Sequence, residues 1–315
     1  MELRNSASSN SLFHFLLLFL ISSSLPSLTL SATVRCNPHD KYALLAFKKS
    51  LNNPSDLASW IPNTDCCNWT YIECDPNTNR VTQVSINRAS ISGEIPAAIG
   101  DLPYLDTLVL NNMNLTGSIP YSITKLQHLR RLTISETTLS TRIPQFLGQV
   151  KSLQYLILSV NQLYGPIPAS LANLNKLVSL QLQGNKLSGK IPKSLGKLNL
   201  DSIILLNNKF VGDASMFLRA DAATTWINLS RNRLDFDLSK VGFPLNLTFL
   251  DLSHNRIRGS IPKQITELDS ILVMDFSNNR LCGKIPFGGK MQDQGEYPFL
   301  HNRCLCGPPL PNSCK

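Results

Sequence analysis

The sequence predicts an α/β solenoid, in which short stacked repeats each add one strand to a parallel sheet on the concave side. The first observation is an Ile-Pro pair that recurs at a step of 24 residues. The second is a frame of leucines around it, as in LILSVNQLYGPIPASLANL from Leu156. The third is a set of 8 cysteines, which all lie near the two ends of the chain and indicate closed caps. The Ile-Pro prolines are Pro96, Pro120, Pro144, Pro168, Pro192, Pro262 and Pro286.

A period of about 20–29 residues with this leucine spacing is typical of leucine-rich repeats, and about nine of them are expected over residues 81–286. Each xxLxLxx segment is expected to be a short strand whose leucines point inward. A recurring asparagine then turns the chain, and we expect its amide to bond backbone groups of adjacent repeats, because a buried turn needs partners for them. These asparagines are Asn161, Asn185, Asn208, Asn232, Asn255 and Asn279.

Both ends of a solenoid would expose apolar side chains, so we expect a cap over residues 33–80 and another over residues 287–315, to which Cys282 also belongs. In the first cap, CNPHDKYALLAFKKSL predicts a helix. Asn37 is its expected N-cap, with Pro38 at the first helical position and Asp40 at the third. Its apolar face is expected to hold Leu44, Phe47 and Leu51.

The first 32 residues have the layout of a secretory signal peptide. Arg4 precedes an apolar run from Leu12 to Ile21, and the small residues Ser31 and Ala32 follow. This run is too short to span a bilayer, and no second apolar stretch of spanning length follows it, so we expect a secreted protein without a membrane anchor. The formal charge of +9 favours a polyanionic partner. Secretion excludes nucleic acid and leaves an acidic polysaccharide.

An even number of cysteines in a secreted chain predicts disulfides. Zinc binding is the alternative interpretation of these cysteines, but neither group has paired CxxC spacing or a matching pair of histidines. Because sequence-adjacent cysteines rarely pair, each group is expected to close on itself. The expected pairs are Cys36–Cys66, Cys67–Cys74, Cys282–Cys304 and Cys306–Cys314.

Four Asn-x-Ser/Thr sequons predict glycosylation of the secreted chain, at Asn68, Asn114, Asn228 and Asn246. Catalysis finds no support, because the histidines are scattered and none falls in a nucleophile or metal motif. We therefore expect neither an enzyme nor a metal or cofactor site. The histidines beyond the signal peptide are His39, His128, His254 and His301.

The solvent-facing strand positions form the expected binding surface, and several of them hold large apolar residues, such as Tyr155, Val160 and Trp226. Such side chains over several repeats predict contact with a protein, although some could be packed under neighbours or under a glycan. The same counting makes Ser135, Ser159, Ser230, Ser253 and Ser277 solvent-facing. The expected partner-binding residues are Arg131, Thr133, Tyr155, Ile157, Val178, Gln181, Gln183, Ile204, Trp226, Phe249, Asp251 and His254.

The residue after the repeat asparagine is basic in five consecutive repeats. Equal repeat positions are expected to stack at the strand spacing of roughly 4.8 Å, which would line up cations for an extended polyanion such as demethylated pectin. The alternative is an ordinary solvated charged face. The expected pectin-binding residues, which we call the basic ladder, are Lys186, Lys209, Arg233, Arg256 and Arg280.

The segments DKYALLAFKKSLNNPSDLASW, FVGDAS and NRCLCGPPLPNSC, together with the Gly-x-Ile-Pro repeat, resemble plant polygalacturonase-inhibiting proteins. The resemblance implies a cell-wall inhibitor of microbial or insect endopolygalacturonase, which binds the enzyme with its concave face. We expect the protein to be a monomer. This chain departs from the family in three respects. It has Ile157 and Ile204 where the family tends to carry aspartates, it shows nine repeats rather than ten, and Asn228 places a sequon on the concave face.

Two alternatives stay open. A plant antifreeze protein has closely similar architecture, but ice binding would require a flat, regular array of similar small residues, and the concave positions are varied. A soluble extracellular recognition or signalling module is the other alternative. The sequence shows neither a membrane span nor a kinase that would make the chain a receptor by itself.

Overall fold

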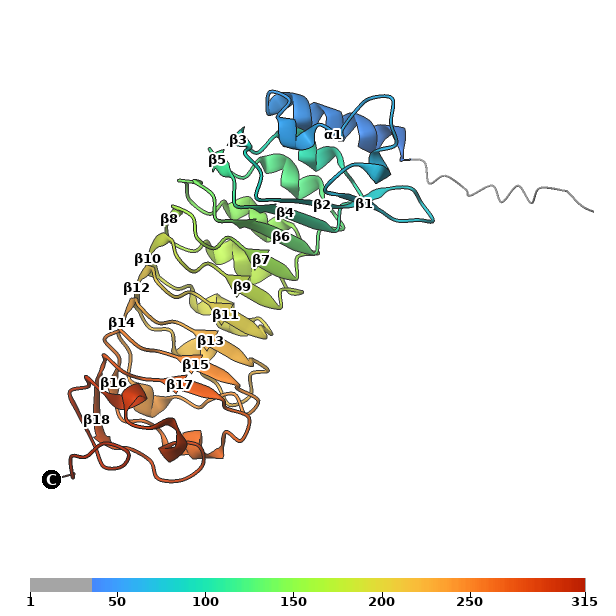
Figure 1. Cartoon of the computed structure of the whole chain (residues 1–315). Helices are drawn as coiled ribbons and strands as arrows, with labels where there is room; N and C mark the ends of the chain where they lie inside the picture. Colours follow the sequence, from blue (N-terminus) through green and yellow to red (C-terminus); the bar gives the residue numbers. More distant parts are fainter. Residues whose placement is uncertain (1–35, 315) are drawn as a thin grey trace, which may run out of the picture. The chain divides into compact units, whose positions relative to one another are not determined.

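The computed structural model describes residues 36–314, which stack turn upon turn as a solenoid (Figure 1). The predicted signal peptide lies outside the described residues. Among the described residues, none belongs to a helix with the length and hydropathy needed to cross a membrane.

A sheet of 10 strands runs along the whole solenoid, and we call it the main sheet (Figure 1). Strand β1 is antiparallel to β2, and every later strand is parallel to its neighbour. The strands, in spatial order, are β1 (Ile72–Cys74), β2 (Val81–Asn87), β4 (Thr107–Asn111), β6 (Arg131–Ser135), β7 (Tyr155–Ile157), β9 (Ser179–Gln181), β11 (Ser202–Ile204), β13 (Trp226–Asn228), β15 (Phe249–Asp251) and β17 (Val273–Asp275).

Alternating burial along these strands confirms the predicted orientation of the leucines. In β4, Leu108 and Leu110 are buried, whereas Thr107, Val109 and Asn111 are partly exposed. A strand turns successive side chains to opposite faces, so one face of the main sheet packs on the core and the other is left for solvent. We call this second face the concave face.

Three smaller sheets form just after the repeat-asparagine position, which holds Ala89 and Met113 in the first two repeats, and they lie on a different side of the solenoid from the main sheet (Figure 1). Their strands are β3 (Ser92–Glu94) with β5 (Asn114–Thr116); β8 (Tyr164–Gly165), β10 (Lys186–Lys190), β12 (Lys209–Gly212) and β14 (Arg233–Leu234); and β16 (Arg258–Gly259), β18 (Arg280–Lys284) and β19 (Cys304–Cys306).

Short 3-10 helices complete the repeats, and in six of them the proline of the Ile-Pro pair is the N-cap. Proline suits this position because its fixed φ prepares the turn and its missing N–H leaves no donor without a partner. These six helices are η3 (Ala97–Asp101), η4 (Tyr121–Lys125), η5 (Gln145–Gln149), η6 (Ala169–Asn173), η7 (Lys193–Lys197) and η10 (Lys263–Glu267). The others are η1 (Ser55–Leu57), η2 (Cys66–Asn68), η8 (Ser215–Phe217), η9 (Leu238–Lys240), η11 (Gln292–Gln294) and η12 (Tyr297–Phe299).

The repeat asparagines bond backbone groups of neighbouring turns, as predicted. The Asn185 amide donates to the carbonyl oxygens of Leu182 at 3.0 Å and of Leu158, in the preceding repeat, at 2.8 Å. Its oxygen accepts from the Leu163 N–H at 3.0 Å. These bonds satisfy backbone groups that water cannot reach, and they tie each turn to the one before it. The same arrangement occurs at Asn161, Asn208, Asn232, Asn255, Asn279 and Asn302.

The predicted cap helix is confirmed as α1 (Pro38–Ser50), which begins as expected at Asn37. The side chain of Asn37 accepts from the His39 N–H at 3.0 Å, which satisfies one of the free donors of the first turn. Leu44 and Phe47 are buried among the core residues of the first turns. The helix therefore covers the apolar end of the solenoid.

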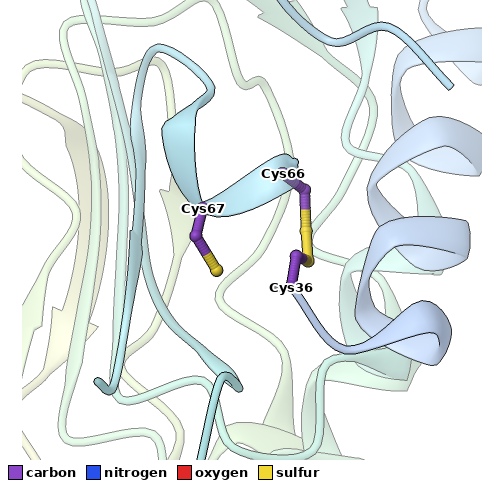
Figure 2. Close-up of side chains that lie close together, drawn as sticks. All are labelled: Cys36, Cys66 and Cys67. Atoms are coloured by element: carbon purple, nitrogen blue, oxygen red, sulfur yellow. A yellow bond between two sulfur atoms is a disulfide. The ribbon is translucent and has the colours of Figure 1, made fainter. Parts of the chain in front are cut away.

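Four disulfides close the two ends of the solenoid, and they are the pairs expected from the sequence. Figure 2 shows the bridge between Cys36 and Cys66, with the sulfur of Cys67 nearby. The two cysteines of this bridge join the start of α1 to η2, so the helix is fastened to the loop that follows it. The other bridges are Cys67–Cys74, Cys282–Cys304 and Cys306–Cys314.

One further turn with the geometry of the repeats lies inside the predicted C-terminal cap. The Asn278 N–H donates to the Leu300 carbonyl at 3.0 Å, His301 has the positive φ of a strand end, and the Asn302 oxygen accepts from the Leu281 N–H at 3.1 Å. This turn lacks both the Ile-Pro pair and the leucine spacing. The sequence pattern therefore places it in the cap, although its backbone continues the repeats.

Candidate functional site

The expected partner-binding residues all lie on six neighbouring strands, β6 to β15, or within three residues of them. None of the twelve is buried. Trp226 is the most open of the apolar ones, with 41% of its surface exposed. The structure thus brings these residues together on one face, as the repeat counting predicts, and their role in binding remains a prediction.

Two ring systems stand on this face. The rings of Trp226 and Phe249 are stacked, with centroids 4.1 Å apart and planes 1° apart. Tyr155 lies three strands away from Trp226. The Arg131 guanidinium lies 4.1 Å from the centre of the Tyr155 ring. Val273 is directly opposite Phe249 on the next strand and is exposed. Rings supported in this way are held rigidly, which is a favourable property for an interface anchor.

Two aspartates stand beside the aromatic pair, at the C-terminal end of the concave face. Asp251 on β15 is directly opposite Asp275 on β17. Burial raises the pKa of Asp275, and the like charge of Asp251 acts in the same direction. Ile157 and Ile204 occupy the corresponding outward positions on earlier strands. At this outward strand position, carboxylates therefore occur on the last two strands of the main sheet, β15 and β17.

Asn228, the sequon asparagine on β13, is partly exposed and lies on the same face as Trp226, two residues away. Its side-chain oxygen accepts from the Ser230 hydroxyl at 2.7 Å, and this serine is the third residue of its own sequon. A glycan at Asn228 would begin beside the aromatic pair. The other sequon asparagines, Asn68, Asn114 and Asn246, are exposed and lie outside the strands of the main sheet.

The expectation that Ser135, Ser159, Ser230, Ser253 and Ser277 face solvent is wrong, because all five are buried. Each of them is followed by a residue with positive φ. The chain leaves the extended conformation here, so the side chain tucks under the turn instead of continuing the alternation. The Ser135 hydroxyl, for example, donates to the Asn111 side chain at 2.7 Å. Small polar residues suit such a position.

The basic ladder is exposed at all five positions, and its side chains follow one another along the smaller sheets. The spacing expected from the sequence is wrong, however, because the strands of these sheets are staggered. Lys209 is opposite Ser188 rather than Lys186, and Arg233 is opposite Val211 rather than Lys209. A shift of two residues added to one strand spacing gives about 8 Å between the Cα atoms of successive basic residues.

A cleft of about 470 Å³ lies at the N-terminal end of the main sheet, where the sequence predicts no site. Tyr104 and His128 stack in it with centroids 5.4 Å apart, and the Arg80 guanidinium lies 4.3 Å from the centre of the Tyr104 ring. Arg130 forms a bidentate ion pair with Asp106 beside them. The equal repeat positions of Tyr104 and His128 were the signal available in the sequence, since residues 24 apart are neighbours in this fold.

Cys36, Cys66 and Cys67 bring their sulfur atoms within 4.8 Å of one another, and Figure 2 shows this cluster. Cysteine binds metals as the thiolate. All three sulfurs are instead bonded in disulfides, to each other or to Cys74. The cluster is therefore a structural crosslink and not a zinc site.

Family models match three parts of the chain. "Leucine rich repeat N-terminal domain" matches residues 37–75, "Leucine-rich repeat region" matches residues 84–226, and "Leucine Rich Repeat" matches residues 246–268. The first of these corresponds to the cap with α1, and the others correspond to turns of the main sheet. They confirm the predicted leucine-rich-repeat fold.

Polygalacturonase inhibitors match the chain over nearly its whole length. The protein of that name from Vitis vinifera is 49% identical over 330 residues, covering 95% of this chain and 98% of the relative. Polygalacturonase inhibitor 1 from Arabidopsis thaliana is 53% identical over 303 residues, covering 87% of this chain and 92% of the relative. The crystal structure of a plant ice-binding protein is similar with a TM-score of 0.76 and 37% identity, covering 89% of this chain and 99% of that one.

The curated relatives are named as inhibitors, which confirms the prediction that the chain is not an enzyme. Their identities of 49% and 53% exceed the 37% of the ice-binding protein, so the inhibitors carry the assignment. The chain belongs to the polygalacturonase-inhibitor family of leucine-rich repeat proteins.

Proposed function

We propose that the chain is a secreted, cell-wall protein that inhibits a microbial or insect endopolygalacturonase by covering the enzyme's cleft with its concave face. The observation that carries this proposal is the stacked pair of Trp226 and Phe249, standing open on a continuous sheet surface with Val273 beside it. Stacked aromatic side chains bury much apolar area at little entropic cost when a protein covers them. The names of the relatives supply the class of partner.

Inhibition of this kind requires no chemistry by the chain itself. The aromatic pair anchors the enzyme, and the carboxylates of Asp251 and Asp275 attract cationic groups at its cleft. The rigid main sheet holds all four side chains in fixed positions, so little order has to be created on binding. The substrate is excluded because the same cleft cannot hold both the inhibitor and a polysaccharide chain.

Secretion is supported by the layout of residues 1–32, by the four disulfides and by the four sequons. Disulfides persist in oxidising compartments such as the extracellular space.

The test is an inhibition assay with the purified, glycosylated protein against a panel of fungal, bacterial and insect endopolygalacturonases, which measures the release of reducing ends from pectin. We expect at least one enzyme to be inhibited through a reversible complex. An ice-recrystallisation assay on the same sample tests the ice-binding alternative. Inhibition of ice recrystallisation, with no enzyme bound or inhibited, would overturn the proposal.

Pectin binding is a second candidate function, favoured by the five exposed cations of the basic ladder in successive repeats. The Cα spacing of about 8 Å is comparable to the Debye length at physiological ionic strength, so neighbouring cations act together on an extended polyanion. Such binding would hold the inhibitor near the substrate of the enzyme that it blocks.

A further inference from the structure

One to three residues after each strand of the main sheet from β2 to β17, one residue has a left-handed backbone, and in one turn this residue is a valine. The φ of Val160 is 52°, close to the 54° of Asn112 and the 68° of Gly184. The fold requires this conformation, because it points the N–H of this residue toward the next repeat. The Val160 N–H donates to the Gln183 carbonyl at 2.8 Å. The other positions are Arg88, Glu136, Asn207, Arg231, His254, Asn278 and His301.

Val160 is the β-branched member of this set, and the left-handed region is unfavourable for such a side chain. Asparagine and glycine meet the same backbone requirement without this strain, and other turns use them. Burial offers no compensation, because 52% of the Val160 surface is exposed. Neither the backbone nor the core therefore accounts for a valine here.

The surroundings leave one side of Val160 open. Gly184 occupies the equal position in the next turn, and a Cβ built on it would lie 3.4 Å from the Val160 Cα and 3.5 Å from its Cγ2. Because glycine has no Cβ, this position beside Val160 is not filled by a side chain of Gly184. Tyr155 and Ile157 precede Val160 on the same turn and are partly exposed, so this turn presents three apolar side chains in succession.

We propose that Val160 is a specificity-determining contact, against which the inhibited enzyme places an apolar side chain in the space above Gly184. This inference rests on the proposed function, because it takes the same enzyme as the partner. Strained backbone conformations are often found at functional sites, where the side chain has a role that a less strained residue could not fill. An exposed apolar side chain beside a free space is suited to contact with a partner protein.

The experiment measures thermal unfolding and the inhibition constant for one inhibited enzyme, in the full glycosylated chain. Val160→Asn relieves the strain, so the unfolding temperature should rise by about 2 °C. The same change removes the contact, so inhibition should weaken by about fivefold or more. A residue with a merely structural role would not change stability and inhibition in opposite directions.

Gly184→Asn tests the free space, because asparagine accepts the left-handed backbone and its side chain fills the position beside Val160. This variant should fold and should weaken inhibition about as much as Val160→Asn. Asn112→Val is the matched control, since it introduces the same strain two turns away. It should lower the unfolding temperature by about 2 °C and leave inhibition unchanged.

Unchanged inhibition in both Val160→Asn and Gly184→Asn would overturn the inference while leaving the proposed function intact. A fall in the unfolding temperature of Val160→Asn would refute the strain argument. A parent protein that binds none of the enzymes refutes the proposed function, and the contact proposed for Val160 with it.

Discussion

The carboxylate of Asp40 is fully buried and joins the cap helix to the first turn of the repeats through Arg80. It accepts from Nε and Nη2 of Arg80 at 2.9 and 2.6 Å, and from the Val81 N–H, at the start of β2, at 2.8 Å. The hydrogen bond to Asp40 raises the pKa of Arg80. The same guanidinium covers the ring of Tyr104, so this ion pair joins α1, the start of β2 and the segment before β4.

Asp40→Asn should lower the free energy of unfolding by about 3–5 kcal/mol, because it leaves a partly buried guanidinium without its counter-charge. Urea unfolding followed by circular dichroism measures the change. Asp101→Asn is the control, since the ion pair of Asp101 with Lys125 is exposed and should contribute less than about 1 kcal/mol. Equal losses in the two variants would show that the buried pair has no special role.

Gly148→Ala should destabilise the protein by about 1–3 kcal/mol, since the added Cβ would overlap the backbone of the next turn. The position of that Cβ is 2.2 Å from the Ser170 carbonyl oxygen. Thr124→Ala changes the equal position of the preceding turn without adding an atom there, and it should change stability by less than about 0.5 kcal/mol. Thermal unfolding of both variants measures the difference. A neutral Gly148→Ala would mean that adjacent turns can separate.

Trp226→Ala should weaken inhibition by about 1 kcal/mol or more, which is roughly a fivefold rise in the inhibition constant, if the aromatic pair anchors the enzyme. Phe287→Ala is the control, because Phe287 is 76% exposed and lies beyond the main sheet. It should leave inhibition unchanged. Truncation of both Trp226 and Tyr155 to alanine with no loss of inhibition would move the interface away from the concave face.

Asp275→Asn should stabilise the protein at pH 7. Burial raises the pKa of Asp275, so between the ordinary and the raised value the folded state retains a proton that the unfolded state has lost, and above both values the buried carboxylate is ionised at a cost. Stability therefore falls as pH rises from the ordinary aspartate value of 3.8 through the raised value. The variant lacks this loss, so its advantage over the parent should grow across that window and vanish below it. Both proteins are produced without N-glycosylation, because the change creates an Asn-x-Ser sequon with Phe276 and Ser277. Urea unfolding of both proteins as a function of pH measures the effect, and a constant difference would contradict it.

The triple variant Lys209→Gln, Arg233→Gln and Arg256→Gln should elute from demethylated pectin at lower salt than the parent, with unfolding unchanged because these side chains are exposed. Lys193→Gln, Lys197→Gln and Lys263→Gln remove the same charge from helices η7 and η10 and should change elution less. Neither protein should be retained on fully methyl-esterified pectin. If the two triple variants elute from demethylated pectin at the same salt concentration, the basic ladder is only a solvated charged face.

Much of the fold follows from short-range sequence patterns. The period of 24 residues places equal positions side by side, so the inward leucines, the bonds of Asn185 and the stacking of Trp226 on Phe249 all derive from one repeat unit. Residues near in sequence also decide the N-cap at Asn37. These features are predictable because each depends on one turn and its nearest neighbour.

The sequence by itself therefore determined the repeat fold, the cap helix, the pairing of cysteines within each end, and which side chains share the concave face. Only the tertiary structure decided what depends on distant residues or on departures from the repeat. Asp40 and Arg80 are 40 residues apart and share no repeat position, so no pattern joins them. The stagger beneath the basic ladder and the strain at Val160 arise where the chain leaves the strand, because backbone geometry there, and not side-chain alternation, sets the position of each side chain.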